Sequence, residues 1–134
     1  MAKTVEIKKK EKEEEVFVEE TGVVSATARY VRMSPRKLRL VADMVRGDSI
    51  ADARVTLSFS PRAAAKVIDK LISSAVANAE NNHDLNGDDL FVSRVLVNGG
   101  PVMKRIRARA MGRAARIRKR TSHVTVELSQ RSEE

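Results

Sequence analysis

The side chains of this sequence that could do chemistry are mainly cations, and the densest group of them lies near the C-terminus. Residues 103–120 have the sequence MKRIRARAMGRAARIRKR, and no acidic residue lies between Asp89 and Glu127. Arginine and lysine bind phosphate groups, so a run of one sign predicts a polyanionic ligand. A merely solvated loop would usually mix signs. The cations of this stretch are Lys104, Arg105, Arg107, Arg109, Arg113, Arg116, Arg118, Lys119 and Arg120.

A second basic group surrounds the predicted start of a helix at about residues 35–46. Cations at this end of a helix oppose its dipole, which favours a role in ligand binding. A solvated basic face is the alternative interpretation. The group consists of Arg29, Arg32, Arg36, Lys37 and Arg39. Farther along, Asn78 and Asn82 lie near the end of a long predicted helix, where amides either end the helix or contact RNA.

Neither catalysis nor metal binding is predicted. The sequence has no Cys, which excludes disulfides, thiolate ligands and a thiol nucleophile. His83 and His123 are the only histidines and fall in different predicted elements, so we expect no metal site. Residues 99–101 (Gly-Gly-Pro) lack the strand–loop–helix setting and the Lys-Ser/Thr pair of a phosphate-binding loop. We therefore expect no enzyme activity and no cofactor.

Composition also points to a nucleic-acid ligand. A chain of 134 residues suits one modest domain, and its net charge of +8 favours a polyanionic partner. Aromatic residues make up only 3%, which argues against a module that stacks single-stranded bases on aromatic platforms. No apolar run reaches the ~18 residues of a membrane span and no signal-peptide core is present, so we expect a cytoplasmic protein without a membrane partner.

The basic stretch is predicted to form the outer part of a long β-hairpin over about residues 98–123. Segments 91–97 and 122–128 on either side are rich in Val, a composition typical of strands. Gly112, near the middle, can adopt the positive φ that hairpin turns often need. An isolated two-stranded ribbon is marginally stable in water, so we expect the hairpin to need a partner to hold its shape.

Side-chain alternation predicts how the hairpin changes along its length. On the returning strand, the face that carries Val124 near the body carries Arg118 farther out. On the outgoing strand, Val97 has the same phase as Arg107, although residues 99–101 could shift the register. A face that is apolar at the body and basic outside it is expected of a strand that enters an anionic partner.

The whole pattern predicts an α+β fold: a small domain of three helices and a three-stranded antiparallel sheet, with the hairpin protruding. The apolar residues of the second strand change phase between Val92 and Val95, which favours a bulge near Ser93-Arg94 over a strand covered on both faces. The order of the strands does not follow from the pattern. The other expected elements are a strand at 23–31 and helices at about 35–46, 49–57 and 61–82, the last starting at Ser60-Pro61.

Residues 1–20 are expected to be a flexible extension. Twelve of them are charged, and they offer little apolar surface that could pin a helix to the body. The rest of the chain, residues 21–134, is expected to form one nucleic-acid-binding domain that includes the hairpin.

The sequence resembles bacterial large-subunit ribosomal protein twenty-two over about residues 24–130. The last of the three segments that carry the resemblance is highly specific, because its short motifs occur in the order and spacing of the family. The segments are RYVRMSPRKLRLVADMVRG (29–47), AKVIDKLISSAVANAENN (65–82) and GPVMKRIRARAMGRAARIRKRTSHVTV (100–126).

This resemblance implies a structural, non-catalytic component of the large ribosomal subunit. Family members bind 23S ribosomal RNA and neighbouring ribosomal proteins, as monomers within the cytoplasmic ribosome. Their body lies near the exit of the polypeptide tunnel, and the hairpin tip lines the tunnel. There the tip meets the nascent chain and indirectly affects sensitivity to macrolide antibiotics. A free nucleic-acid-binding regulator that shares the fold is the alternative hypothesis.

The resemblance also adds residues to the predicted sites. Ser34, Ser122 and His123 join the cations as RNA-binding residues. Ala108 stands where many members have Pro, so the bend of the outgoing arm does not follow from the family, and neither does a role for residues 1–20. The tip that is expected to line the tunnel consists of Arg109, Ala110, Met111, Gly112 and Arg113.

Overall fold

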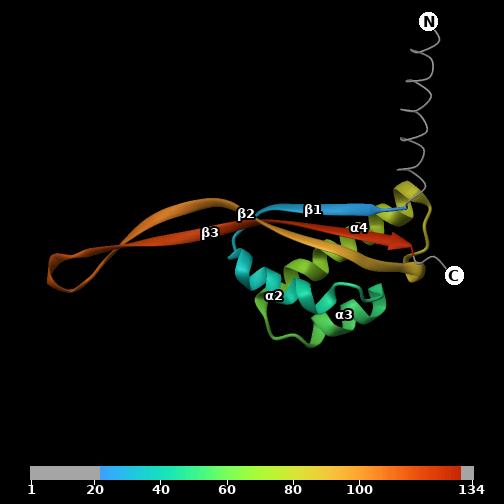
Figure 1. Ribbon diagram of the computed structural model, residues 1–134, viewed down its shortest axis with the longest axis horizontal. Helices are drawn as coiled ribbons and strands as arrows, with labels where there is room; N and C mark the ends of the chain where they lie inside the picture. Colours follow the sequence, from blue (N-terminus) through green and yellow to red (C-terminus); the bar gives the residue numbers. More distant parts are fainter. Residues whose placement is uncertain (1–21, 131–134) are drawn as a thin grey trace, which may run out of the picture.

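Within residues 22–130, which the computed structural model describes, three helices cover one face of a three-stranded antiparallel sheet (Figure 1). Two of the strands continue beyond the helices as a long hairpin, so the predicted α+β class is confirmed. The extension expected at residues 1–20 lies outside the described residues. The elements are β1 (Val24–Val31), α2 (Pro35–Val45), α3 (Ile50–Phe59), α4 (Ala63–His83), the short 3₁₀ turn η1 (Gly87–Asp89), β2 (Leu90–Ala108), the turn η2 (Ala110–Gly112) and β3 (Ala114–Gln130).

The strand β3 lies at the centre of the sheet, whose order is β1-β3-β2. The pairing of β1 with β3 ends at Val31 and Ser122, whereas β2 stays paired with β3 as far as Ala108 and Ala114. Beyond the end of β1 the sheet is therefore a two-stranded ribbon. The hairpin is an extension of the same ladder that runs through the core. We call its outer segments the free arms: residues 102–108 and 114–120.

A bulge lies in β2 at the predicted place. The register passes from Val92 opposite Leu128 to Arg94 opposite Glu127, which gives β2 one extra residue. As a result, Val92 and Val95 both face the helices, with exposed fractions of 0% and 2%. The change of apolar phase in the sequence is thus absorbed by one local irregularity.

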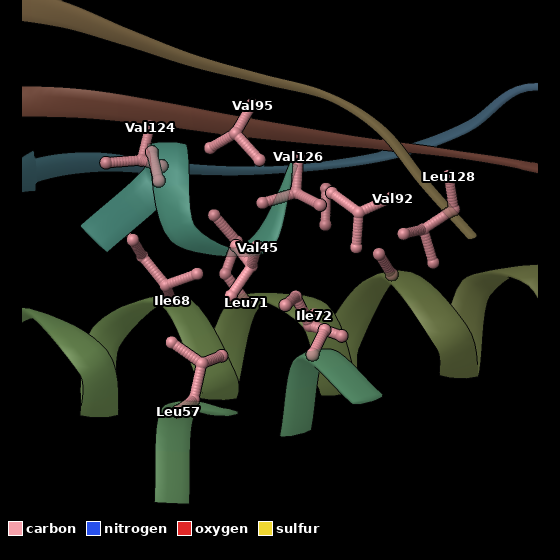
Figure 2. Close-up of a cluster of buried hydrophobic side chains, with 14 of the residues drawn as sticks. Val45, Leu57, Ile68, Leu71, Ile72, Val92, Val95, Val124, Val126 and Leu128 are labelled. Carbon is pink, nitrogen blue, oxygen red and sulfur yellow. The ribbon is translucent and has the colours of Figure 1, made fainter. Parts of the chain in front are cut away.

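The core is a layer of aliphatic side chains between the sheet and the helices (Figure 2). The helix α4 runs along the sheet and points its apolar stripe towards the strands, with Ile68 and Ile72 fully buried. Residues three or four apart share a face of a helix, so the stripe of α4 covers β1 and β3, while α2 and α3 cover β2. The sheet side of this core consists of Val24, Ala26, Leu90, Val92, Val95, Val97, Val124, Val126 and Leu128.

The residues at the ends of α2 and α3 are of types that favour helix boundaries. Pro35 is the first residue of α2 after Ser34, and Gly47 turns the chain away with a φ of +89°. Ser49 caps α3, because its Oγ accepts a hydrogen bond of 3.2 Å from the N–H of Asp52. These local signals fix where the helices start and stop.

The predicted start of the long helix at Ser60-Pro61 is wrong. The helix α4 begins at Ala63 with Arg62 as its N-cap. Ser60 instead ends α3, since its N–H donates to the carbonyl oxygen of Leu57 at 3.2 Å. A residue before proline is held in an extended conformation, so Ser60 joins the two helices and starts neither.

The predicted phase of the outgoing strand is also wrong beyond Gly99. A second bulge between Gly99 and Val102 gives β2 another extra residue relative to β3. Arg107 therefore lies on the opposite face from Val97, and Lys104 takes the phase of Val97 instead. The shift that the Gly-Gly-Pro segment made conceivable does occur.

Two leucines of α2 test this description of the core. Leu38 is fully buried and Leu40 is 50% exposed. We expect Leu38→Ala to lower the free energy of unfolding by about 2–5 kcal/mol, because it leaves a cavity, and Leu40→Ala to lower it by about 1 kcal/mol or less. Urea denaturation followed by circular dichroism measures both. Equal losses would contradict the buried face assigned to α2.

Candidate nucleic-acid interface

The free arms carry cations on both faces. The strand β3 has no extra residue in this region, so Arg118 lies on the same face as Val124, as predicted, and Lys104 is its partner on β2. The other face carries Arg107 and Lys119. The bulge in β2 thus spreads positive charge around the ribbon, and the arms can meet phosphate groups from either side.

Carboxylates do not neutralise the hairpin from within the described part of the chain. The ion pairs there join Arg46 to Asp43 at 2.8 Å and Arg94 to Glu127 at 3.8 Å. Both lie in the body, outside the free arms. The charge of the hairpin is therefore left for an external anion, whose approach it favours.

A hollow lies at the base of the hairpin, where the free arms meet the helices. We call it the junction groove; its volume is about 610 Å³. Six of its lining residues are cations and none is acidic, so it is a strongly positive site at the surface. The groove is lined by Arg32, Met33, Ser34, Lys37, Arg62, Ala63, Ala64, Met103, Arg118, Lys119 and Arg120.

Two helices begin at this groove. Ser34 is the N-cap of α2 and Arg62 the N-cap of α4, and neither side chain makes a capping hydrogen bond. Neither first turn carries an acidic residue. The positive ends of both helix dipoles therefore add to the field of the six cations.

Sequence reasoning missed Arg62. The predicted helix start at Ser60-Pro61 placed Arg62 inside the helix, whereas it caps α4 and lines the groove. Its position beside a predicted helix start could have identified it, because the same feature identified Arg36 and Lys37. Only the packing of α4 beside the hairpin shows that these separate segments meet.

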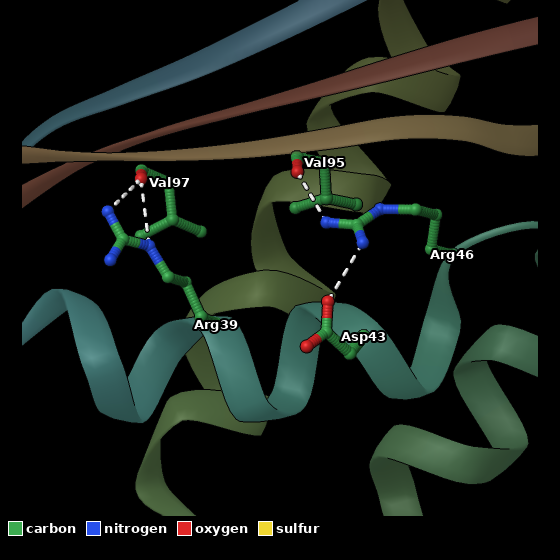
Figure 3. A network of polar contacts seen from close by, with 5 residues as sticks. All are labelled: Arg39, Asp43, Arg46, Val95 and Val97. Carbon is green, nitrogen blue, oxygen red and sulfur yellow. Dashed lines mark hydrogen bonds and ion pairs between the residues drawn. The ribbon is translucent and has the colours of Figure 1, made fainter.

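Arg39, a predicted RNA ligand, braces the edge of the sheet (Figure 3). Its Nε and Nη2 atoms donate to the carbonyl oxygen of Val97 at 3.3 and 3.1 Å. Arg46 acts in parallel, donating to the carbonyl oxygen of Val95 at 3.0 Å and to Asp43 at 2.8 Å. Because β2 is an edge strand, these carbonyls have no strand partner, and the arginines satisfy them.

Three further predicted ligands also make contacts inside the protein. The Nδ2 of Asn78 donates to the carbonyl oxygen of Ser25 at 3.3 Å. Ser122 is fully buried, and its Oγ donates to the carbonyl oxygen of Met33 at 2.6 Å. The Nδ1 of His123 accepts a backbone N–H from β1. RNA contact by these residues stays a prediction, and their bonds favour a structural role.

The other predicted ligands divide into three groups. The first lies on the hairpin outside the groove and is exposed: Lys104, Arg105, Arg107, Arg109, Arg113 and Arg116. Arg29, Arg36 and Asn82 are exposed but do not line the groove. The predicted ligands that the fold brings together in the groove, from segments far apart in the sequence, are Arg32, Ser34, Lys37, Arg118, Lys119 and Arg120.

The hairpin ends in a tight turn that presents one large apolar side chain. The N–H of Arg109 donates to the carbonyl oxygen of Arg113 at 2.7 Å. Met111 and Gly112 have φ values of 59° and 67°, and glycine suits such a conformation. Met111 is 94% exposed. The strand β2 reaches Ala108, directly before this turn.

Comparisons with known proteins point to one family. A family model for ribosomal protein L22p/L17e matches residues 26–129. The large ribosomal subunit protein uL22 of Pediococcus pentosaceus is 52% identical over 117 residues, which cover 87% of this chain and 99% of that protein. The uL22 of Halothermothrix orenii is 54% identical over 108 residues, covering 81% and 96%. That of Caldicellulosiruptor saccharolyticus is 50% identical over 112 residues, covering 84% and 92%.

The bracing role of Arg39 can be separated from ligand binding by a matched pair of variants. Arg39→Met removes the bonds to the carbonyl of Val97, and Arg36→Met makes the same chemical change at an exposed position of the same helix. We expect the first variant to lose about 1 kcal/mol of stability, a Tm shift of a few degrees, and the second to lose almost none. Thermal unfolding followed by circular dichroism measures the Tm of both variants. Identical Tm values would contradict the bracing role of Arg39.

Proposed function

Because this chain belongs to the L22p/L17e family of ribosomal proteins, we propose that it is a structural constituent of the large ribosomal subunit that binds 23S ribosomal RNA. The observation that carries the proposal is the junction groove, where six cations and two helix N-termini converge with no acidic residue. Such a site suits the phosphate backbone of folded RNA.

Recognition in the groove and along the free arms depends on phosphates and shape. Guanidinium groups such as those of Arg62 and Arg118 can bind phosphate oxygens in a bidentate way. The two most exposed aromatic side chains of the body, Tyr30 and Phe59, do not line the groove. Stacking of unpaired bases is therefore a minor part of the proposed interaction.

The hairpin is proposed to run inward through the RNA, with its tip at the wall of the polypeptide exit tunnel. Each free arm has seven residues, or about 23 Å at ~3.3 Å per residue, and carries cations on both faces, as a ribbon surrounded by RNA requires. At the tip, Arg109–Arg113 would contact the nascent chain, and Met111 offers it an apolar surface. Sensitivity to macrolide antibiotics would depend on the tip indirectly.

The remaining parts of the proposal concern the setting of the protein. It acts as a single copy within the cytoplasmic ribosome, with its body beside neighbouring large-subunit proteins near the tunnel exit, and without catalysis. None of the helices within residues 22–130 combines the length and the apolar composition of a membrane span. No group of three or more potential metal ligands occurs in that part of the chain. Residues 21–134 are proposed to work as one domain.

The groove can be tested with two variants of equal charge. Arg62→Gln with Arg118→Gln removes two groove cations, and Lys66→Gln with Lys70→Gln removes two exposed cations of α4 outside the groove. We expect the groove variant to bind 23S RNA fragments more weakly, with the slope of log K against log[salt] reduced by roughly one to two units.

The control variant should keep most of the slope, although its net charge is the same. Filter binding over a series of salt concentrations gives the slope for each variant. Equal losses of slope would show that net charge alone matters and that the groove is not the site. Cosedimentation with large subunits in high salt separates a ribosomal constituent from a free RNA-binding regulator, which would wash off.

The proposed reach of the hairpin can be tested by shortening both arms in register. Arg105 pairs with Ile117 and Ile106 with Arg116, so deleting all four residues joins intact pairs and keeps every remaining side chain on its face. We expect the protein to assemble into subunits with its tip withdrawn by about 7 Å, two residues of strand. The response of cells to macrolides should change.

Density maps of purified subunits carrying this deletion show where the tip lies. The control deletes Arg105 and Ile106 alone, which leaves two residues of the other arm unpaired and should disorder the ribbon. A tip at its original place in the shortened protein would refute the proposed reach.

A further inference from the structure

Three consecutive side chains of β3 bind three different backbone segments at the base of the hairpin. Thr121, Ser122 and His123 each make one such hydrogen bond, to the β2 bulge, to the residue before Ser34 and to β1. We call these residues the hairpin clamp. They lie where β1 ends and the free arms begin.

Thr121 closes the bulge in β2. Its Oγ1 donates to the carbonyl oxygen of Pro101 at 2.6 Å, and the residue is only 6% exposed. Gly100 packs directly against this hydroxyl, since a Cβ added at Gly100 would lie 2.6 Å from the Oγ1 and 3.3 Å from His123 Nε2. The bulge and the threonine therefore fit each other only because residue 100 lacks a side chain.

Ser122 ties the base of the hairpin to the helices. Its fully buried Oγ donates to the carbonyl oxygen of Met33 at 2.6 Å. Met33 and the following Ser34 line the junction groove on the body side. The serine thus links the strand that carries Arg118 and Arg120 to the wall that faces them.

His123 supports a strained residue of β1. Tyr30 has a φ of +56°, which is unfavourable for a residue with a side chain, and its N–H donates to His123 Nδ1 at 3.0 Å. The two rings also meet edge to face, with centroids 4.9 Å apart. In this geometry Nδ1 carries no proton and acts as an acceptor.

The backbone ladder is weakest at this level. The pairing of β1 with β3 is irregular between Ala28 and Val31, and that of β2 with β3 between Gly99 and Val102. Both irregular segments lie beside Ser122 of the central strand. Ordinary ladder bonds therefore hold the ribbon to the body less well here than elsewhere, and side-chain bonds take over.

We propose that Thr121, Ser122 and His123 are positioning residues, which fix the direction in which the hairpin leaves the body. By doing so they hold the hairpin cations of the junction groove against those of the helices. This inference concerns the free protein and does not depend on RNA binding. It gives Ser122 and His123 a role other than the RNA contact predicted from the sequence.

The direction of the hairpin can be measured by electron–electron distance spectroscopy on spin labels. The chain has no Cys, so Ser74→Cys on α4 and Lys104→Cys near the base of the free arms place labels at two exposed sites only, with little of the flexible ribbon between them. In the otherwise unchanged protein we expect one narrow distance distribution. Adding Thr121→Val and Ser122→Ala should broaden it by roughly twofold or more, because the two-stranded arm then pivots at its base.

Matched controls separate an effect on the direction of the hairpin from an effect on the stability of the fold. Thr125→Val removes a hydroxyl bond of the same strand, to Thr27 at 3.1 Å, but inside the body, and should leave the distribution narrow. Thr121→Ser, in a protein that is otherwise unchanged, keeps the hydroxyl, so its distance distribution should stay narrow. An unchanged width in the Thr121→Val, Ser122→Ala protein would overturn the proposal.

Two glycines test the clamp without removing a buried hydroxyl. Gly100→Ala pushes the Thr121 side chain away, whereas a Cβ at Gly99 would meet nothing within 4 Å. We expect Gly100→Ala to broaden the distance distribution as the loss of Thr121 does, and Gly99→Ala to leave it narrow. Equal widths for the two glycine variants, with both proteins folded by circular dichroism, would also overturn the proposal.

Discussion

The pairing of β2 with β3 is the interaction on which the rest of the structure depends. The same ladder begins among the buried valines and ends at the tip turn, so the core and the hairpin are one continuous element. The body anchors the ribbon through burial of apolar side chains, which is non-directional. Outside the body none of the described helices packs on the ribbon, which keeps only its ladder bonds and its charges (Figure 1). A second packing layer has to come from another molecule.

Much of the fold could be predicted because its signals are local. The apolar stripe of α4, the proline that starts α2 and the glycine that follows it all act within one or two helical turns. The bulge near Ser93 was predictable because the apolar phase changes there. The bulge beyond Gly99 was not, since exposed, charged residues give no apolar phase against which a register shift could be read.

The candidate site was predictable in composition but not in arrangement. A run of arginines indicates phosphate binding whatever the tertiary structure. Which cations bind and which brace depends on neighbours that are distant in sequence: Arg39 meets the free edge of β2, and Arg62 meets the hairpin base. For the same reason Ser122, an ordinary strand residue in the sequence, proves to be buried beneath the loop that precedes α2.

The sheet order also determines when the protein can be completed during its synthesis. Of the described strands β1 is made first, yet its one neighbour, β3, is made last, so Val24 and Leu128 meet across about a hundred residues. Until then the apolar faces of the helices lack the central strand that covers them. The basic hairpin is made in the same final stretch. The core can therefore close, and the hairpin can bind an anionic partner, only near the end of synthesis and at about the same time.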